Sequence, residues 1–349
     1  MSDFHALNIS EVKRETPNAV SISFEIPEHL KNVFAFKAGQ YITIKHTVNG
    51  KEIRRAYSLC SSPKSAKLKV GIKSVPNGSF SVFANTQLKA GDTLDVMPPE
   101  GKFILETNAE NSNNYAAFAA GSGITPVLSI IQNALEDEPK STFVLVYGNK
   151  TPNESMFLTE LSRLQESYPD RFFIQFVMSR EETENSLFGR IDRSTVNYIL
   201  KNKHKDLSFD AFYLCGPEPM IDEVSSTLKE NGINEKRIHH ELFTTSEEGL
   251  LVEPHDGNTT VTVTLDDETE TFVMPQTKSV LEAALAEGID APYSCQGGIC
   301  STCIARIVEG KAEMRKNQIL TDGEIAEGLI LTCQAHPTSP KLVVDYDDV

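Results

Sequence analysis

The stretch Cys295–Cys303, with the sequence CQGGICSTC, decides how the C-terminal part of this chain is interpreted. Its cysteines have the spacing C-x4-C-x2-C, and 29 residues separate Cys303 from a fourth cysteine, Cys333. This spacing is typical of the four thiolates that hold a plant-type [2Fe–2S] cluster. The glycines between the cysteines allow a tight loop that points backbone N–H groups at the sulfur atoms. The sequence therefore predicts Cys295, Cys300, Cys303 and Cys333 as metal ligands.

Two other interpretations of these cysteines remain open, a zinc knuckle and four unrelated thiols. Zinc sites favour two C-x2-C pairs, and this chain contains one. The remaining cysteines, Cys60 and Cys215, lie far apart in separate motifs, so no disulfide framework is expected. A reducing, cytoplasmic compartment fits both the free thiols and the cluster.

Composition sets the broad class of the chain. A length of 349 residues suits two or three domains, and 40% hydrophobic and 23% charged residues are ordinary values for a soluble globular protein. No basic region followed by an apolar run stands at the N-terminus, so no secretory signal is expected. No apolar stretch approaches the length that crosses a bilayer, so no membrane partner is expected.

The net charge of −16 is denser at the C-terminal end. Residues 258–349 hold 15 Asp or Glu and 6 Lys or Arg, so this end carries −9 of the total. Nucleic-acid binding needs a basic surface, so the charge argues against a nucleic-acid partner. An acidic redox module can be steered to a basic patch on a partner protein, but acidity also serves plain solubility.

The chain is expected to contain three domains. Residues 1–108 have period-two alternation in short runs such as Val20–Ile26, which predicts a small antiparallel β-barrel. In residues 109–243, apolar strand candidates alternate with helix candidates, which predicts a doubly wound parallel sheet. Residues 244–257 have the composition of a linker, and residues 258–349 are expected to form a small mixed sheet packed on a helix.

Two motifs in the second domain have the chemistry of a dinucleotide site. Gly121–Ser122–Gly123–Ile124–Thr125–Pro126 follows a predicted strand and opens a predicted helix, where an anion is favoured. Cys215–Gly216–Pro217 follows a later strand of the same sheet. Each motif alone is equally consistent with a structural turn, but ligands bind at the C-terminal ends of such strands.

Two motifs in the first domain suit a ring system and a phosphate. In Arg55–Ala56–Tyr57–Ser58, expected after the second pair of barrel strands, the arginine can pair with a phosphate and the tyrosine can lie against a ring. Gly78–Ser79–Phe80–Ser81 is expected to be a Gly-rich turn with N–H and hydroxyl donors.

Together these motifs resemble those of the ferredoxin–NADP reductase-like flavoproteins, here with a plant-type ferredoxin domain of β-grasp fold at the C-terminus. The resemblance covers essentially the whole chain and implies FAD, NADPH and a [2Fe–2S] cluster as redox groups. The FAD residues that it implies are Arg55, Tyr57, Ser58, Gly78, Phe80 and Ser81. The nucleotide residues that it implies are Gly121, Gly123, Thr125, Cys215, Gly216 and Pro217.

The resemblance also implies a catalytic set and a specificity pair. Ser58 would lie near the reactive flavin nitrogen and Cys215 by the nicotinamide, with Glu241 and Phe243 as an acidic and aromatic ending near the flavin. Ser179 and Arg180 resemble a pair that grips a 2′-phosphate, which favours NADPH over NADH. The neighbouring Glu181 and Glu182 weaken this inference, and a solvated strand end is the alternative.

The expected activity is transfer of electrons from NADPH through FAD and the cluster to an oxygenase component. The resemblance points to a multicomponent oxygenase as the acceptor, and specifically to the di-iron epoxidase that acts on phenylacetyl-CoA. Two alternatives remain open: a reductase for another oxygenase, such as a Rieske-type ring hydroxylase, and a non-enzymatic iron–sulfur redox sensor.

Overall fold

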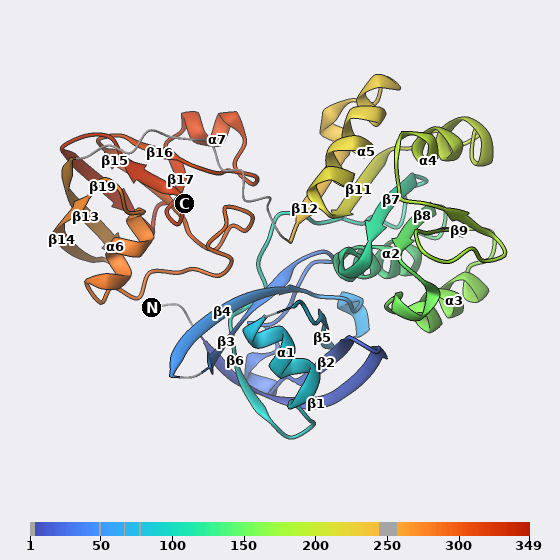
Figure 1. The fold of residues 1–349 in the computed structure, drawn as a ribbon, viewed down its shortest axis with the longest axis horizontal. Coiled ribbons are helices and arrows are strands. Elements are labelled where there is room, and N and C mark those ends of the chain that lie inside the picture. Colours follow the sequence, from blue (N-terminus) through green and yellow to red (C-terminus); the bar gives the residue numbers. More distant parts are fainter. Residues whose placement is uncertain (1–3, 49, 66, 77, 244–256) are drawn as a thin grey trace. The chain divides into compact units, whose positions relative to one another are not determined.

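The structure, a computed structural model, describes residues 4–48, 50–65, 67–76, 78–243 and 257–349. The chain divides into two compact units (Figure 1). Of the described residues, the larger unit contains His5–Ile53 and Tyr57–Phe243, and the smaller unit contains Phe4, Arg54–Ala56 and residues 257–349. The linker expected at residues 244–257 falls almost entirely on positions 244–256, outside the described residues.

Apart from Arg54–Ala56 of β4, the larger unit contains the strands β1 (His5–Thr16), β2 (Ala19–Glu25), β3 (Tyr41–Val48), β4 (Lys51–Ser58), β5 (Leu68–Lys73), β6 (Thr93–Val96), β7 (Asn114–Ala120), β8 (Thr142–Asn149), β9 (Phe172–Met178), β10 (Ser186–Phe188), β11 (Ala211–Gly216) and β12 (Ile238–Leu242). Its α-helices are α1 (Ser79–Thr86), α2 (Ile124–Asp137), α3 (Leu158–Ser167), α4 (Arg193–Tyr198) and α5 (Glu218–Glu230). The smaller unit contains β13 (Asn258–Leu265), β14 (Glu268–Pro275), α6 (Val280–Ala286), β15 (Ile304–Glu309), β16 (Ala312–Met314), α7 (Asp322–Ala326), β17 (Leu329–Leu331), β18 (Ala335–Pro337) and β19 (Lys341–Asp345).

The first six strands form the predicted antiparallel barrel. Their order is β4-β3-β6-β1-β2-β5, and a bridge between Leu59 and Val70 joins the end of β4 to β5, so the sheet closes on itself. The alternation in β2 predicts one buried face, but the serine face is buried too. Ser21 Oγ donates to Glu15 Oε1 at 2.7 Å, and this hydrogen bond offsets the cost of burying the hydroxyl.

The next six strands form the predicted doubly wound sheet. Their order is β10-β9-β8-β7-β11-β12, and all of these neighbours pair in parallel. In Figure 1, α2 and α3 lie on one side of this sheet and α4 and α5 on the other. The strand order reverses between β7 and β11, and ligands bind at such a reversal in open α/β sheets.

Within the larger unit, the barrel packs directly on the parallel sheet and its helices. A Cβ added at Gly71 of β5 would lie 2.7 Å from Thr125 Cγ2 of α2 and 2.9 Å from Met156 Cε, so a larger residue here would force these side chains to move. Ser129 Oγ of α2 donates to the buried carbonyl of Ser61 at 2.7 Å. These contacts fix where the barrel motifs lie relative to the ends of β7 and β11.

The smaller unit has the predicted β-grasp fold, with a five-stranded sheet in the order β14-β13-β19-β15-β17. Strands β13 and β14 form a hairpin, and β13 pairs in parallel with β19. Helix α6 begins after Ser279, whose hydroxyl accepts a hydrogen bond from Glu282 N and caps the helix. Residues 287–303 connect α6 to β15, and Cys333 lies between β17 and β18.

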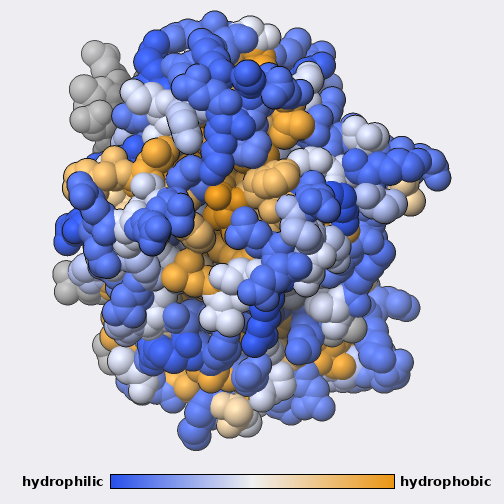
Figure 2. All heavy atoms as spheres, turned by 90° about the vertical axis from the view of Figure 1, so that its right-hand side faces the viewer, coloured by the Kyte–Doolittle hydropathy of each residue, from blue (hydrophilic) through white to orange (hydrophobic). Residues whose placement is uncertain are grey.

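Hydrophilic side chains cover most of the surface on the side viewed in Figure 2, and apolar side chains are gathered in its centre. Phe188 of the edge strand β10 is 63% exposed. Among the described residues, no helix combines the length and apolarity needed to cross a bilayer.

Candidate functional site

The motif Arg55–Ser58 lies within β4 and not after it, so the strand itself presents these side chains. Along a strand, successive side chains point to opposite faces. Ser58, the last residue of β4, is buried, and Arg55 is exposed. The half-buried ring of Tyr57 packs at 5.6 Å from the ring of Phe80, so the two barrel motifs meet.

The Gly-rich turn expected at Gly78–Ser81 is instead the start of a helix. Gly78 is the N-cap of α1, and Ser81 Oγ accepts a hydrogen bond from Val75 N at 3.3 Å. A Cβ added at Gly78 would lie 2.6 Å from Val75 Cγ2 and closer still to Ser81 Oγ. The hydroxyl of Ser81 therefore holds the preceding loop, and the donors that remain for an anion here are backbone N–H groups of the first helical turn.

The Gly121–Pro126 loop follows β7 and opens α2, as the sequence predicts. Gly121 has φ +55°, a conformation that favours glycine. A Cβ added at Gly123 would lie 2.5 Å from the carbonyl carbon of Cys215 and closer still to its oxygen. Thr125 is buried, and its hydroxyl donates to the carbonyl of Ser122 at 2.9 Å, so this side chain stabilises the loop.

The Cys215–Pro217 motif ends β11 beside that loop, and Pro217 caps α5. Cys215 is fully buried, and it lies opposite Glu241 in the parallel pairing of β11 with β12. Burial and the nearby carboxylate of Glu241 raise the pKa of the Cys215 thiol well above its ordinary value. This thiol therefore stays protonated and uncharged at physiological pH.

Ser58 and Glu241 meet although 183 positions separate them. Ser58 Oγ donates to Glu241 Oε2 at 2.9 Å, and both side chains are buried. Phe243 follows β12 and packs against the apolar cluster that includes Cys215. The structure thus brings together all three side chains expected to be catalytic, Ser58, Cys215 and Glu241.

Ser179 and Arg180 follow β9 directly, as the sequence predicts. Ser179 N and Arg180 N donate to the carbonyls of Asn149 and Lys150, each at 2.9 Å, so this segment runs beside the end of β8. Arg180, Glu181 and Glu182 are exposed.

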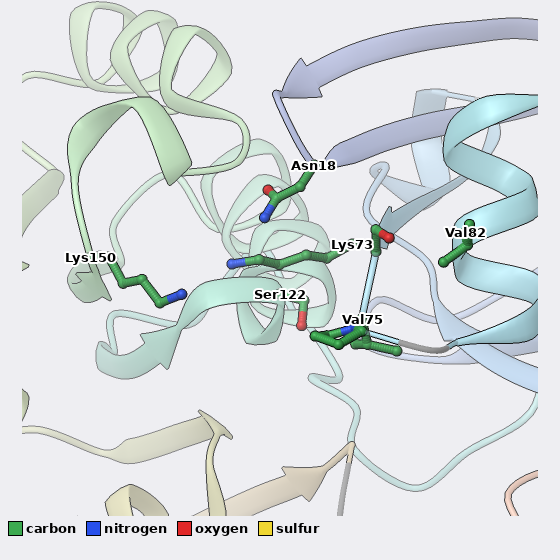
Figure 3. A pocket seen from close by; sticks show the side chains of 8 residues that line it. Asn18, Lys73, Val75, Val82, Ser122 and Lys150 are labelled. Atoms are coloured by element: carbon green, nitrogen blue, oxygen red, sulfur yellow. The ribbon is translucent and has the colours of Figure 1, made fainter.

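A cavity of about 500 Å³ opens beside the glycine loop in the larger unit (Figure 3). The side chains of Lys73, Lys150 and Ser122 point into it. Burial lowers the pKa of Lys73, and a Cβ added at Gly121 would lie 3.8 Å from Lys73 Nζ. Sequence analysis missed both lysines; the available signal was their position, since Lys73 ends β5 and Lys150 follows β8.

The four cysteines of the smaller unit are arranged as two thiol pairs. The Cys300 thiol, followed by the backbone N–H of Gly297, lowers the pKa of Cys295 to about 7, and Gly297 N lies 3.3 Å from Cys295 Sγ. A hydrogen bond to Cys295 correspondingly raises the pKa of Cys300. In the second pair, the Cys303 thiol lowers the pKa of Cys333.

This donor set suits a two-iron cluster, in which each iron takes two thiolates and the sulfur atoms accept backbone hydrogen bonds. Beyond the Cys303 thiol, the N–H of Gly298 and the side chain of Gln334 also lower the pKa of Cys333. Next to Cys295, the fully buried Ser294 Oγ has no hydrogen-bond partner. Among the described residues, no three His, Cys, Asp or Glu side chains are gathered as for a single metal ion.

Comparison with known families assigns each part of the chain. Residues 6–104 match the oxidoreductase FAD-binding domain, and residues 118–226 match the oxidoreductase NAD-binding domain. Residues 263–338 match the 2Fe-2S iron-sulfur cluster binding domain.

Individual proteins match over nearly the full length. A subunit of the 1,2-phenylacetyl-CoA epoxidase of Escherichia coli (strain K12) is 38% identical over 351 residues, which cover 99% of each chain. The ferredoxin reductase component of the 3-ketosteroid-9-alpha-monooxygenase of Rhodococcus rhodochrous is 34% identical and covers 97% of this chain and 96% of its own. The solved structure of a phthalate dioxygenase reductase has a TM-score of 0.61 at 23% identity over 98% of each chain, which supports the fold.

Proposed function

Since this chain belongs to the family of ferredoxin–NADP reductase-like flavoproteins with a C-terminal [2Fe–2S] ferredoxin domain, we propose that it carries electrons from NADPH to an oxygenase component. The observation that supports this most is the meeting of Ser58 with Glu241 beside Cys215, where the flavin and nucleotide motifs converge. When bound, FAD would accept the two electrons of a hydride and release them singly to a [2Fe–2S] cluster.

The buried side chains at this meeting point suit hydride transfer. Glu241 accepts a hydrogen bond from the Ser58 hydroxyl and so fixes the orientation of that hydroxyl at the end of β4. Cys215 presents a neutral thiol, so it adds no negative charge where a nicotinamide ring would lie. Because Ser58, Glu241 and Cys215 are all buried, they also help to exclude water from the reacting atoms.

The remaining motif residues would bind the two nucleotides. Arg55 of β4 and the N-terminal turn of α1 suit the FAD pyrophosphate, and Tyr57 suits a face of the ring system. The Gly121–Gly123 loop, together with Lys73, suits the pyrophosphate of the pyridine nucleotide.

NADPH is favoured over NADH because cationic groups gather near the Gly121–Gly123 loop. The Arg180 amide bonds to the carbonyl of Lys150, and the Lys150 side chain points into the same cavity as Lys73. A 2′-phosphate dianion would gain charge-assisted contacts from these groups. The exposed Glu181 and Glu182 oppose the preference, since acidic residues suit the free ribose hydroxyls of NADH.

The electron acceptor would be the oxygenase component of a multicomponent system in the cytoplasm. Both relatives named above are subunits or components of oxygenases, and the one with the higher identity belongs to the phenylacetyl-CoA epoxidase. We therefore propose the di-iron epoxidase of phenylacetyl-CoA degradation as the first acceptor, with this chain making no contact with the CoA substrate. Reconstitution with candidate oxygenase components tests this: product formed with another oxygenase but not with the epoxidase would reassign the partner.

Anaerobic addition of NADPH to the purified holoprotein tests the proposed route. We expect the flavin and the cluster to lose their visible absorption together, with NADH acting at higher concentration. A cluster that stays oxidised while the flavin is reduced would contradict the route and would favour a redox sensor.

A further inference from the structure

Gln334 connects the two segments that carry the cluster cysteines. It directly follows Cys333, and its Nε2 donates to the carbonyl of Gln296 at 3.0 Å. Gln296 directly follows Cys295 and has φ +53°, a backbone conformation that residues other than glycine rarely adopt. This single amide therefore joins the first segment, at its strained residue, to the segment that carries the fourth cysteine.

The same side chain packs against the middle of the loop. A Cβ added at Gly298 would lie 3.1 Å from Gln334 Cγ and 2.8 Å from the carbonyl oxygen of Lys316, so the loop is confined from two sides. The carbonyl of Gly298 accepts a hydrogen bond from Gln318 N at 3.0 Å. Held in this way, the Gly298 N–H lowers the pKa of Cys333.

Hydrogen bonds to ligating sulfur atoms change the reduction potential of an iron–sulfur cluster. Reduction adds one electron and therefore one negative charge to the cluster. An N–H donor stabilises the more negative state, so each donor raises the potential. The N–H of Gly298 and the side chain of Gln334, which directly follows Cys333, both lower the pKa of Cys333, as donors to a sulfur atom do.

We propose that Gln334 is a positioning residue that fixes the Cys295–Cys300 loop against Cys333 and raises the reduction potential of the cluster. The inference rests on the proposed function, because it requires that the four cysteines hold a [2Fe–2S] cluster. The inference gives a role at the cluster to a residue that is not one of the four cysteines.

Gln334→Leu in the full-length holoprotein removes the amide and keeps a side chain of similar size. We expect the oxidised-to-reduced equilibrium of the cluster to shift about five-fold toward the oxidised form, the effect of one lost hydrogen bond. For a one-electron couple this is about 40 mV more negative. The potential is measured by dithionite titration in the presence of mediators, with the reduced cluster quantified by electron paramagnetic resonance.

Gln334→Glu sharpens the sign of the effect. A carboxylate has nearly the shape of the amide but cannot donate, and it adds a negative charge beside Cys333. The potential of this variant should therefore fall further than that of Gln334→Leu. If the leucine variant does not retain its cluster, this isosteric variant alone decides the question, because an unchanged potential would overturn the proposal.

Gln276→Leu is the matched control. Gln276 Nε2 donates to Thr259 Oγ1 at 3.0 Å, so this variant also loses an amide hydrogen bond of the smaller unit, outside the cluster loop. We expect its potential, and the rate at which a chelator removes its iron, to equal those of the wild type, whereas Gln334→Leu should lose iron several-fold faster. Equal potentials and equal rates of iron loss in the Gln334 and Gln276 variants would overturn the positioning role.

The same samples separate the two hypotheses. A wild-type preparation that lacks iron would contradict the proposed function itself. An intact cluster whose potential does not respond to either Gln334 substitution would contradict only the inference about Gln334.

Discussion

Cys215 at the end of β11 and Cys295 at the start of the cluster loop have opposite surroundings. Cys215 is fully buried beside the carboxylate of Glu241, which raises its pKa, so the sulfur remains a neutral thiol. Cys295 receives a hydrogen bond from the Cys300 thiol and one from the N–H of Gly297, which lower its pKa to about 7.

The comparison separates two ways of using sulfur in one chain. In the larger unit, buried side chains such as Ser58 and Glu241 form hydrogen bonds with one another. The Cys215 thiol packs among them as an uncharged group. In the smaller unit, a neighbouring thiol and then a backbone N–H of the glycine-rich loop lower the pKa of Cys295 and of Cys333, which favours the thiolate, and thiolates are the form that binds metal. Electron transfer at the two places should therefore respond to different substitutions.

The largest effect is expected for Cys300→Ser. Losing one thiolate of a pair should prevent assembly of the cluster, so reduction of a protein acceptor should fall at least a hundred-fold. Reduction of ferricyanide directly from the flavin should stay within about two-fold of the wild type, because the larger unit is untouched. Iron content and the two reductase assays measure this.

Cys60→Ser is the control for that variant. Cys60 is a buried thiol of the larger unit, and burial raises its pKa. Because Cys60 is not one of the four cluster cysteines, its replacement should leave the iron content unchanged. If Cys300→Ser lost ferricyanide reduction together with the cluster, the two regions would not respond separately to substitution, which would contradict the comparison.

Ser58→Ala should slow reduction of the flavin by NADPH by about ten- to a hundred-fold, because a hydrogen bond to a buried charged group is worth ~1.5–3 kcal/mol. Stopped-flow absorbance measures the rate. Ser129→Ala is the control. This variant also loses a buried hydrogen bond, which the Ser129 hydroxyl donates to Ser61 O at 2.7 Å, and the bond lies outside the cofactor motifs. Similar rates in the two variants would remove Ser58 from the reaction.

Arg180→Ala should weaken binding of NADPH by about ten-fold and leave NADH nearly unchanged, because only NADPH carries the 2′-phosphate. Lys150→Ala should act in the same direction. Dissociation constants from flavin absorbance titrations with each nucleotide measure the effect. Equal losses for both nucleotides would exclude a role for these cations in 2′-phosphate recognition.

Gly123→Ala should lower the free energy of unfolding of the larger unit by about 1–3 kcal/mol, because the new Cβ would overlap the carbonyl of Cys215. Gly121→Ala should cost about 1–2 kcal/mol for a different reason, since its φ of +55° is unfavourable for alanine while the space beside it is open. Urea denaturation measures both. NADPH affinity should fall mainly in Gly123→Ala, and the reverse order would contradict the close packing of Gly123 on Cys215.

The smallest effect is expected for pH. Because the pKa of Cys215 is raised well above its ordinary value, this thiol should stay protonated between pH 6 and 9 and contribute no titration there. The pH profile of flavin reduction should have the same shape in the wild type and in Cys215→Ala. An inflection near pH 8.5 that disappears in the variant would show that the thiol ionises.

Sequence analysis predicts the barrel, the parallel sheet and the β-grasp fold because each depends on local periodicity and turn residues. It also indicates the four cysteines, since their spacing alone carries the signal. The helix that begins at Ser79 is missed, because Gly78 serves equally well as a turn residue and as a helix cap.

Contacts between distant residues cannot be derived from these local patterns. The hydrogen bond from Ser58 to Glu241 depends on how the barrel packs on the parallel sheet, through contacts such as that of Gly71 with Thr125. Lys73 and Lys150 line one cavity only because β5 and β8 end at the same place in the folded unit. The contact of Gln334 with Gln296 likewise spans 38 positions.

The content of flavin, iron and acid-labile sulfide in protein purified without air tests the account most directly. We expect about one FAD, two irons and two sulfides per chain, in keeping with one flavin site and one four-cysteine cluster. Protein supplied with iron and flavin that contains neither of them would contradict the account.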